Sequence, residues 1–592
     1  SFLVLVGWMV LFPPAEPKKE LIENKLVLEE QSNKEILSLK NNVENQISNV
    51  KINNIPIRTE KVDGSISLRG GKINNLKLLD YFETQDKNSE NIVMLRNVED
   101  DNAYYSVYGW TVNKGIDYSS VPNANTIWDL HSGTILTPRN PITLKWDNDN
   151  GQVFFRKVEI DENYMFSITQ TVLNNSQNTV SVAPYGTIAR HGEPDTIGFY
   201  ILHEGIIANI DGTLSQCADL GSSCIFGGRG YDDVRDQPFN QREQANTVSK
   251  LVQNSGWIGY TDKYWMTTLI PKQGQNFEIV SKYTQKTNIY QVDMRLAPIE
   301  VSPGSSSSVK TYFFAGAKEV NTIKGYQKNL FVENFIDAVD WGMLFFLTKP
   351  LFSMLNFFNE IIGNMGWSII LLTLAIKIIL LPLAYKSYVG MSKMKKLQPE
   401  MQKIKERTGT DRTKFQQELL AFYKKEKVNP AAGCLPILLQ IPIFFALYKV
   451  LFVTIEIRHA PFFGWIQDLS APDPTSFINL FGLLPYSTPS SESIFSIISI
   501  GVFPILMGVT MWLQQKLNPA PTDKTQAIIF AWMPWVFMFM LGQFSSGLVI
   551  YWVANNTITF IQQYFIMKSQ GVSPDIFGNI FSNFKKIKKS DK

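Results

Sequence analysis

The chain has 592 residues, enough for several domains, and a formal net charge of only +3. A charge this small argues against a nucleic-acid-binding protein, so the placement of Lys and Arg along the chain is more informative than their total. Residues 1–325 are polar and mixed, whereas residues 331–567 carry nearly all the long apolar runs. This division predicts a multi-domain membrane protein with a large polar domain and a separate apolar one.

The first segment is apolar but short. Residues 2–12 form an apolar run that contains too few residues to cross a bilayer. We interpret residues 1–15 as a partial N-terminal transmembrane helix, and the remnant of a signal peptide is the alternative. Residues 16–50 are rich in Lys, Glu, Asn and Gln, a composition that cannot bury enough apolar surface to fold alone, and they are expected to form a flexible tether.

Apolar and polar residues alternate along much of residues 51–325. Tyr290, Val292 and Met294 alternate with polar neighbours, and the same pattern occurs around Phe166. A period of two is typical of half-buried antiparallel strands. Many such runs, separated by clusters of Asn, Gly, Pro and Asp, predict one large β-sandwich over this region.

The polar part also contains two of the three cysteines, which are too few for a disulfide framework. Cys217 and Cys224 would close a single loop if this part faces an oxidising compartment. A reduced pair at the surface is an equally good interpretation, and the sequence leaves the choice open.

Residues 331–365 are expected to form two amphipathic helices at the membrane surface. In the first, over residues 331–347, Val, Phe, Ile and Met occupy one face while Asp, Glu and Asn occupy the other. Lys349-Pro350 then interrupts the pattern, and a second amphipathic stretch follows.

The rest of the apolar part, residues 366–567, contains runs long enough to cross a bilayer. The five predicted spans cover residues 366–385, 435–455, 494–513, 526–543 and 546–567. Together they predict an α-helical transmembrane core.

The charges between these spans indicate their orientation. Residues 386–427 contain twelve Lys or Arg and five Asp or Glu, a net charge of +7, and the tail 568–592 is rich in lysine. In residues 456–493, by contrast, Arg458 is the only basic residue other than histidine. Because positively charged loops stay in the cytoplasm, the first two segments are predicted to be cytoplasmic and the loop 456–493 and the β-sandwich to lie outside.

Residues 386–427 are expected to form a helical hairpin. Apolar residues recur at spacings of three and four on both sides of a turn at 408–411, where Asp411 is placed to cap the second helix. Pro399 should kink or restart the first helix. A basic hairpin can bind anionic lipid headgroups or the phosphates of ribosomal RNA, and an ordinary positively charged anchor explains it at least as well.

Lys377 is the only charge in the predicted span 366–385. An uncompensated ammonium inside a membrane is costly, so this lysine is a functional-site hypothesis by default. Thr373 lies one turn earlier on the same helical face. In the alternative, Lys377 snorkels to the headgroups, which requires about twice the reach of its side chain.

The last predicted span carries one polar face. Its members are Trp552, Asn555, Thr559 and Gln562, at spacings of three, four and three. These side chains would either bond neighbouring helices or, together with Lys377, line a wet and positively charged groove at bilayer depth. The combination with the lysine favours the groove.

Motifs typical of enzymes are scarce. We find no Gly-rich phosphate loop, no HExxH and no serine elbow between a strand and a helix. His131, His191, His203 and His459 are scattered without the spacing of metal ligands. The sequence therefore predicts no catalytic residues, no metal, no cofactor and no small-molecule substrate.

Several stretches, in their order along the chain, resemble the YidC-type membrane protein insertases in their Gram-negative form with a large periplasmic domain. Among them are GWSIILLTLAIKIILLPL, KMKKLQPEMQKIKER, KVNPAAGCLPILLQIPIFFALY and SSGLVIYWVANNTITFIQQ. The resemblance covers essentially the whole chain. It implies a periplasmic all-β supersandwich and five core helices around a hydrophilic groove. It also implies a location in the bacterial inner membrane with both termini in the cytoplasm.

The resemblance also implies roles for the groove residues. Lys377 stands where the family usually has arginine, so the charge carries over but not the bidentate recognition of carboxylates. Thr373 aligns with a groove threonine, whereas Trp552 stands where relatives often have tyrosine.

The expected activity is the insertion and folding of integral inner-membrane proteins. A client would place a polar or acidic outer segment beside Lys377, and its apolar segment would then move to lipid along the second and fourth core helices. This second path is expected to run past Phe444, Phe445, Met533 and Phe537. The expected partners are nascent membrane proteins, membrane lipids, the Sec translocon, and the ribosome through the basic hairpin and tail.

Two other classes of function would explain parts of the sequence. A solute transporter or channel predicts internal repeats and paired broken helices, and the five apolar runs differ in texture and are odd in number. A membrane-anchored periplasmic binding module would explain the β domain but would give Lys377 and the basic hairpin no role.

Overall fold

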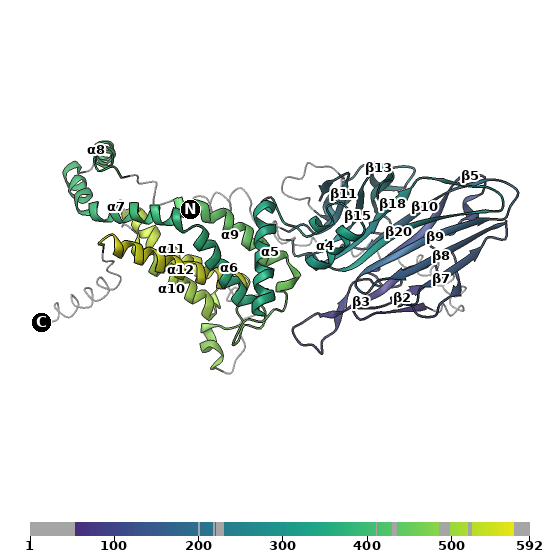
Figure 1. Cartoon of the computed structure of the whole chain (residues 1–592), viewed down its shortest axis with the longest axis horizontal. Coiled ribbons are helices and arrows are strands. Elements are labelled where there is room, and N and C mark those ends of the chain that lie inside the picture. The colour runs from purple at the N-terminus through teal and green to yellow at the C-terminus, as the bar shows by residue number, and fades with distance from the viewer. Residues whose placement is uncertain are drawn as a thin grey trace, which may run out of the picture. The chain divides into compact units, whose positions relative to one another are not determined.

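The computed structural model describes residues 54–198, 202–216, 220, 230–409, 411–428, 435–484, 498–518 and 524–572. The chain divides into two compact units, of which one ends at Asp340 and the other begins at Trp341 (Figure 1). The predictions for the N-terminal helix, the tether, the two cysteines of the polar part and most of the basic tail concern residues outside the described ranges.

The first unit contains two antiparallel sheets, which confirms the predicted β-sandwich (Figure 1). Across the larger sheet run β1 (Asn54–Arg58), β2 (Val62–Ser67), β3 (Lys72–Phe82), β5 (Tyr104–Lys114), β10 (Val180–His191), β18 (Ile289–Leu296), β17 (Phe277–Thr284), β14 (Ala245–Val252) and β13 (Phe239–Asn240), with β4 (Asn91–Val93) beside β3 and β19 (Ile299–Val301) beside β10. Across the other run β12 (Thr213–Ser215), β11 (Gly205–Ile210), β15 (Gly256–Thr261), β16 (Trp265–Ile270), β20 (Ser305–Ala317), β9 (Met165–Asn174), β8 (Gln152–Ile160), β7 (Ile142–Asp147) and β6 (Asp129–Ser132). The short helices η1 (Tyr118–Ser120) and α3 (Tyr231–Arg235) lie between strands.

The alternation that predicted the strands also predicts which side chains form the core. In β18, Tyr290, Val292 and Met294 are fully buried, and in β9 Phe166 and Ile168 are fully buried. Side chains from the two sheets meet between them, where the rings of Trp110 on β5 and Phe154 on β8 lie 5.9 Å apart.

A charged residue lies inside this core. Arg156 on β8 is 1% exposed, and its guanidinium donates hydrogen bonds to the carbonyl oxygens of Gly70 (2.9 Å), Gly71 (3.1 Å) and Tyr108. It also stacks over the ring of Trp128 at 4.5 Å. No carboxylate of the described chain forms an ion pair with it. Burial lowers the pKa of Arg156 to about 10, so it stays charged at neutral pH.

Helix α4 (Val320–Asn329) is fastened to the sandwich by one carboxylate at its N-terminus. Glu319 accepts hydrogen bonds from Lys61 (2.9 Å), Tyr81 (3.0 Å), Tyr164 (2.7 Å) and Thr322 (2.7 Å). We call these five residues the Glu319 clamp. Burial alone would raise the pKa of Glu319, but the hydrogen bonds from Lys61, Tyr164 and Thr322 outweigh it and hold the pKa below its usual value.

The clamp should make the stability of the unit depend on pH. A carboxyl whose pKa is lower in the folded state stabilises the fold above its unfolded pKa of about 4.3, and this contribution is lost as the pH falls through the folded pKa. We therefore expect Glu319→Gln to lower the thermal midpoint at pH 7, and the difference from wild type to shrink between pH 5 and the acid limit of folding. A difference that is constant over this range would contradict the role of the ionised carboxylate.

The structure corrects the predicted helix over residues 331–347. Only a short 3-10 helix, η2 (Phe335–Ala338), forms there, and α5 (Phe345–Ile362) starts later. Asn334 and Gly342 have positive φ angles of 52° and 69°, which an α-helix does not allow. Phe335 is fully buried against Trp257 of the sandwich rather than facing a membrane surface.

The predicted interruption at Lys349-Pro350 is also wrong, because Pro350 lies in the second turn of a continuous α5. The helices after it are α6 (Met365–Ile379), α7 (Leu381–Thr408), α8 (Arg412–Lys425), α9 (Leu435–Val453), α10 (Val502–Leu517), α11 (Lys524–Leu541) and α12 (Ser546–Ser569), with the short helices η4 (Ile455–Ile457) and η5 (Phe477–Gly482) in the loop before α10. Each of the five predicted apolar runs thus overlaps a helix.

Among the described helices, none by itself is both long and apolar enough to cross a membrane, whereas α6 and α7 together meet this criterion across a bend of 68°. Shorter apolar helices occupy Leu438–Val453 and Thr525–Leu541.

The run 366–385 was predicted to be one helix, and the bend divides it. Leu380 ends α6 and precedes α7, in which Pro382 is the second residue. Proline has no N–H and restricts the residue before it, so the α6 hydrogen-bond ladder stops here. Pro399, by contrast, lies inside α7, and the predicted restart at this proline does not occur. Asp411 caps α8 as predicted, accepting hydrogen bonds from the backbone N–H groups of Thr413 and Lys414.

Candidate functional site

A pocket in the helical unit lies between α6, α7, α9 and α12. Most of its wall is apolar and comes from Ile, Leu and Ala side chains. Its lining residues with polar groups are Thr373, Lys377, Tyr388, Gln440, Tyr551, Asn555 and Gln562. An apolar enclosure with a few converging polar groups is the usual form of a binding site.

Lys377 provides the charge of this pocket. Its ammonium donates a hydrogen bond to the side-chain oxygen of Gln440 on α9 (3.1 Å), and the Gln562 amide lies 3.5 Å from the Lys377 carbonyl oxygen. No Asp or Glu of the described residues forms an ion pair with it. The charge therefore has a neutral hydrogen-bond partner but no counter-ion.

The bend after α6 changes the environment expected for Lys377. It is not at the centre of a long helix but in the last turn of α6. The unpaired carbonyl groups at a helix C-terminus carry partial negative charge and favour a nearby cation. The helix end thus lowers the cost of the ammonium without neutralising it.

The structure brings together four of the six residues predicted for the groove. Thr373, Lys377, Asn555 and Gln562 line the pocket, whereas Trp552 and Thr559 are not among its lining residues. The Thr373 hydroxyl donates to the backbone carbonyl of Ile369 (2.7 Å), so it is satisfied within its own helix.

Gln440 was not predicted. The run 435–455 was predicted only as a membrane span, although a glutamine among Leu, Ile and Pro is a signal of a buried polar contact. Its partner could not be found from the sequence, because Lys377 lies 63 residues earlier in the chain.

Trp552 instead joins the residues predicted to guide the apolar segment of a client. Its ring lies 4.4 Å from that of Phe444 and 6.4 Å from that of Phe537. Phe445 is 38% exposed and contacts Phe444, with ring centres 5.4 Å apart. Met533 lies one turn before Phe537 on α11 and is half-buried. The predicted groove and the predicted path to lipid are therefore adjacent along α12.

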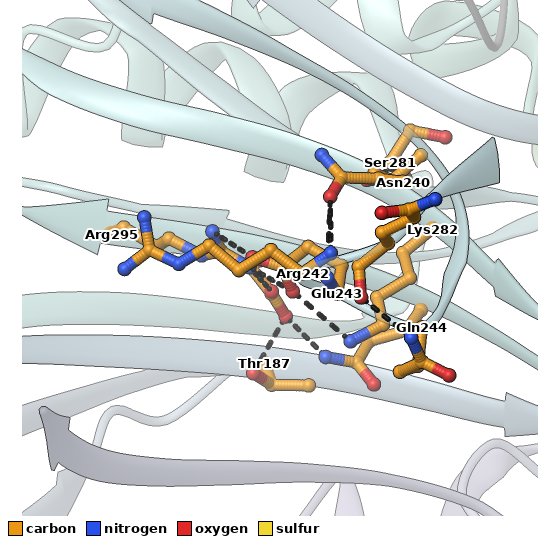
Figure 2. Close-up of polar contacts among 12 residues, drawn as sticks. Thr187, Asn240, Arg242, Glu243, Gln244, Ser281, Lys282 and Arg295 are labelled. Atoms are coloured by element: carbon orange, nitrogen blue, oxygen red, sulfur yellow. Dashed lines mark hydrogen bonds and ion pairs between the residues drawn. The ribbon is translucent and has the colours of Figure 1, made fainter. Parts of the chain in front are cut away.

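A second cluster of charged side chains lies on the sandwich, and its cations are paired with carboxylates (Figure 2). Glu243 accepts hydrogen bonds from Arg295 (2.9 Å) and Lys282 (3.2 Å), and Asp293 accepts from Arg295 (2.9 Å) and Thr187 (2.8 Å). Cations and carboxylates are paired throughout this network. The charges of this network are therefore balanced by ion pairs, whereas Lys377 has no ion pair with a carboxylate of the described residues.

The described residues contain no group of three or more His, Cys, Asp or Glu side chains that could hold a metal ion. The expectations of no cofactor and no catalytic residue stay predictions.

Comparison with known proteins identifies both units. Residues 54–354 match the model of the YidC periplasmic domain, and residues 357–572 match that of the 60Kd inner membrane protein family. The membrane protein insertase YidC of Dinoroseobacter shibae is 51% identical over 602 residues, which cover 100% of this chain and 97% of that protein. The insertase YidC of Roseobacter denitrificans is 53% identical, with the same shares covered.

Among solved structures, a crystal structure of an active YidC insertase with its first transmembrane domain resolved is 17% identical. It covers 95% of this chain and 98% of its own, with a TM-score of 0.35. Because the two matched domains and the two relatives account for nearly the whole sequence, this chain belongs to the YidC family of membrane protein insertases.

Proposed function

We propose that this protein inserts integral membrane proteins into the bacterial inner membrane and helps them to fold, alone or together with the Sec translocon. Its family membership supports the activity. The pocket around Lys377 supports a route for the polar part of the client. The observation that carries this route is an ammonium with a neutral amide partner and no counter-ion among the described residues.

The proposed topology places five spans in the bilayer: residues 366–385, which comprise α6 and the start of α7, and those containing α9, α10, α11 and α12. The rest of α7, α8 and the basic tail lie in the cytoplasm, as do both termini, and the sandwich lies in the periplasm. The charge of +7 over residues 386–427 supports this orientation. The basic surface of α7 and α8 would also attract anionic lipids and the ribosome.

The first step of the proposed mechanism is the entry of a short outer segment of the client into the pocket. A polar segment that enters hydrocarbon loses its hydrogen bonds to water, at a cost of several kcal/mol. The polar lining of the pocket replaces part of this hydration. An acidic side chain gains the Lys377 charge, and the membrane potential adds about 2.3 kcal/mol for each acidic charge per 100 mV.

In the second step, the apolar segment of the client moves into lipid. The aromatic surface of Phe444, Phe537 and Trp552, next to the pocket, offers contacts to an apolar helix during this transfer. Burial of the segment in lipid drives the step, so no nucleotide is required and no covalent chemistry takes place.

The test is the insertion of a small single-span client into liposomes that contain only this purified protein. Protection of the outer segment from added protease should exceed that in empty liposomes. Background protection, with the protein folded and correctly oriented, would overturn autonomous insertion. Flux of small solutes through the same liposomes, without insertion, would support the transporter interpretation instead.

A further inference from the structure

One wall of the Lys377 pocket comes from α7, the first helix after the bend. Leu383, Ala384 and Tyr388 of α7 line the pocket. Because α7 leaves α6 through a bend of 68° at Leu380, the backbone ladder of α6 does not hold this wall in place. Its position depends on side-chain contacts with the other helices.

The apolar contact is small. Tyr388 and Met391 of α7 and Ile566 of α12 are buried together, with Ala384 and Val389 packed beside them. On α7 this cluster covers about two turns, so it is a small attachment for a helix of 28 residues.

Two consecutive lysines on the next turn of α7 contact the ends of two different helices. The Lys396 ammonium donates a hydrogen bond to the carbonyl oxygen of Gln570 (2.8 Å), the C-cap residue of α12. The Lys395 ammonium lies 3.5 Å from the carbonyl oxygen of Leu517, the last residue of α10. The last carbonyls of a helix lack partners within it and form the negative end of its dipole, so each lysine meets a helix end that favours a cation.

Other lysines of α7 provide a comparison. Lys393 and Lys403 are exposed, and the structure records no polar contact of their side chains within the described residues. If only the positive charge of this segment mattered, removing any of these four lysines would have the same effect. Of these four lysines, Lys395 and Lys396 contact the helix ends.

We infer that Lys395 and Lys396 are positioning residues that fasten α7 to the C-terminal ends of α10 and α12 and so hold the α7 wall of the Lys377 pocket in place. This inference rests on the proposed function, since it assigns the two lysines a part in client insertion through the pocket. The lysines touch neither the pocket nor the client, and they act through α7.

The test measures attachment of α7 separately from insertion. Met391→Cys places a thiol that is buried in the attached state, since Met391 is 7% exposed. Full-length protein with Cys217, Cys224 and Cys434 replaced by serine is reconstituted in liposomes and treated with a water-soluble maleimide. In Lys395→Gln/Lys396→Gln, labelling should speed up by about three- to tenfold, the effect of losing two cation contacts with helix ends, and client insertion should fall.

The matched control is Lys393→Gln/Lys403→Gln, which removes the same charge from the same helix and should label as slowly as the parent. Lys395→Arg/Lys396→Arg should restore slow labelling and insertion. A thiol at a second buried site, introduced as Met507→Cys in α10, should stay unlabelled in every variant and shows that the core is folded.

The inference would be overturned if Lys395→Gln/Lys396→Gln labels no faster than the parent, or no faster than the control Lys393→Gln/Lys403→Gln. Faster labelling with unchanged insertion would show that the α7 wall of the Lys377 pocket has no role in client insertion. If the parent protein itself fails to insert the client, the proposed function fails, and the labelling rates still decide whether the lysines fasten α7.

Discussion

Lys377→Ala is expected to slow the insertion of clients with an acidic outer segment by roughly tenfold to hundredfold. A hydrogen bond to a charged group contributes about 1.5–3 kcal/mol, and 1.4 kcal/mol corresponds to a factor of ten. The variant removes this interaction for each acidic side chain that enters the pocket. Time courses of protease protection in liposomes measure the effect.

The same series separates charge from shape. Lys377→Arg keeps the cation and should retain most of the activity, and a client whose outer acids are replaced by amides should be much less sensitive to Lys377→Ala. Lys386→Ala removes an exposed lysine nine residues later and is the matched control. Unchanged insertion of several acidic clients by folded Lys377→Ala protein would reject the proposed role of the pocket.

Arg156→Met should destabilise the sandwich by about 3 kcal/mol or more. The three carbonyl oxygens that accept from this guanidinium would lose their donor inside the core, and each buried unsatisfied group costs about 1–3 kcal/mol. Methionine fills part of the space, so the loss comes mainly from hydrogen bonding. Urea unfolding followed by tryptophan fluorescence measures it, because Trp128 lies directly under Arg156.

Arg156→Lys should recover little of this stability, since one ammonium cannot reach three carbonyls arranged around a planar fork. Arg139→Met, at an exposed arginine of the sandwich, should leave the unfolding midpoint unchanged. A midpoint for Arg156→Met equal to that of this control would show that Arg156 is not needed to satisfy those carbonyls.

The two-sheet fold could be predicted because strand periodicity reports which side chains are buried. Periodicity does not report which polar side chains pair inside the fold. Arg156, Asp293 and Glu319 each find partners from strands or helices far along the chain. Their roles therefore became visible only with the tertiary structure.

The candidate site was predicted in part, for a geometric reason. At about 100° per residue, Asn555 and Gln562 project close to one direction on α12, while Trp552 and Thr559 project roughly 40–60° away from it. The first two line the pocket and Trp552 turns to the aromatic surface. The spacing of three, four and three predicted a single polar face of α12, whereas these residues are divided between two neighbouring surfaces of the helix.

The Glu319 clamp has a mechanical consequence. It joins the first described strands, through Lys61 and Tyr81, to the start of α4, and the Tyr326 hydroxyl of α4 donates to Asp161 (2.6 Å). Tension on the chain that leaves this unit at Asp340 must pass α4 before it reaches β20. We therefore expect such a force to be shared among several polar contacts around α4 before it reaches the strand, so these contacts should protect β20 from pulling at the C-terminal end of the sandwich.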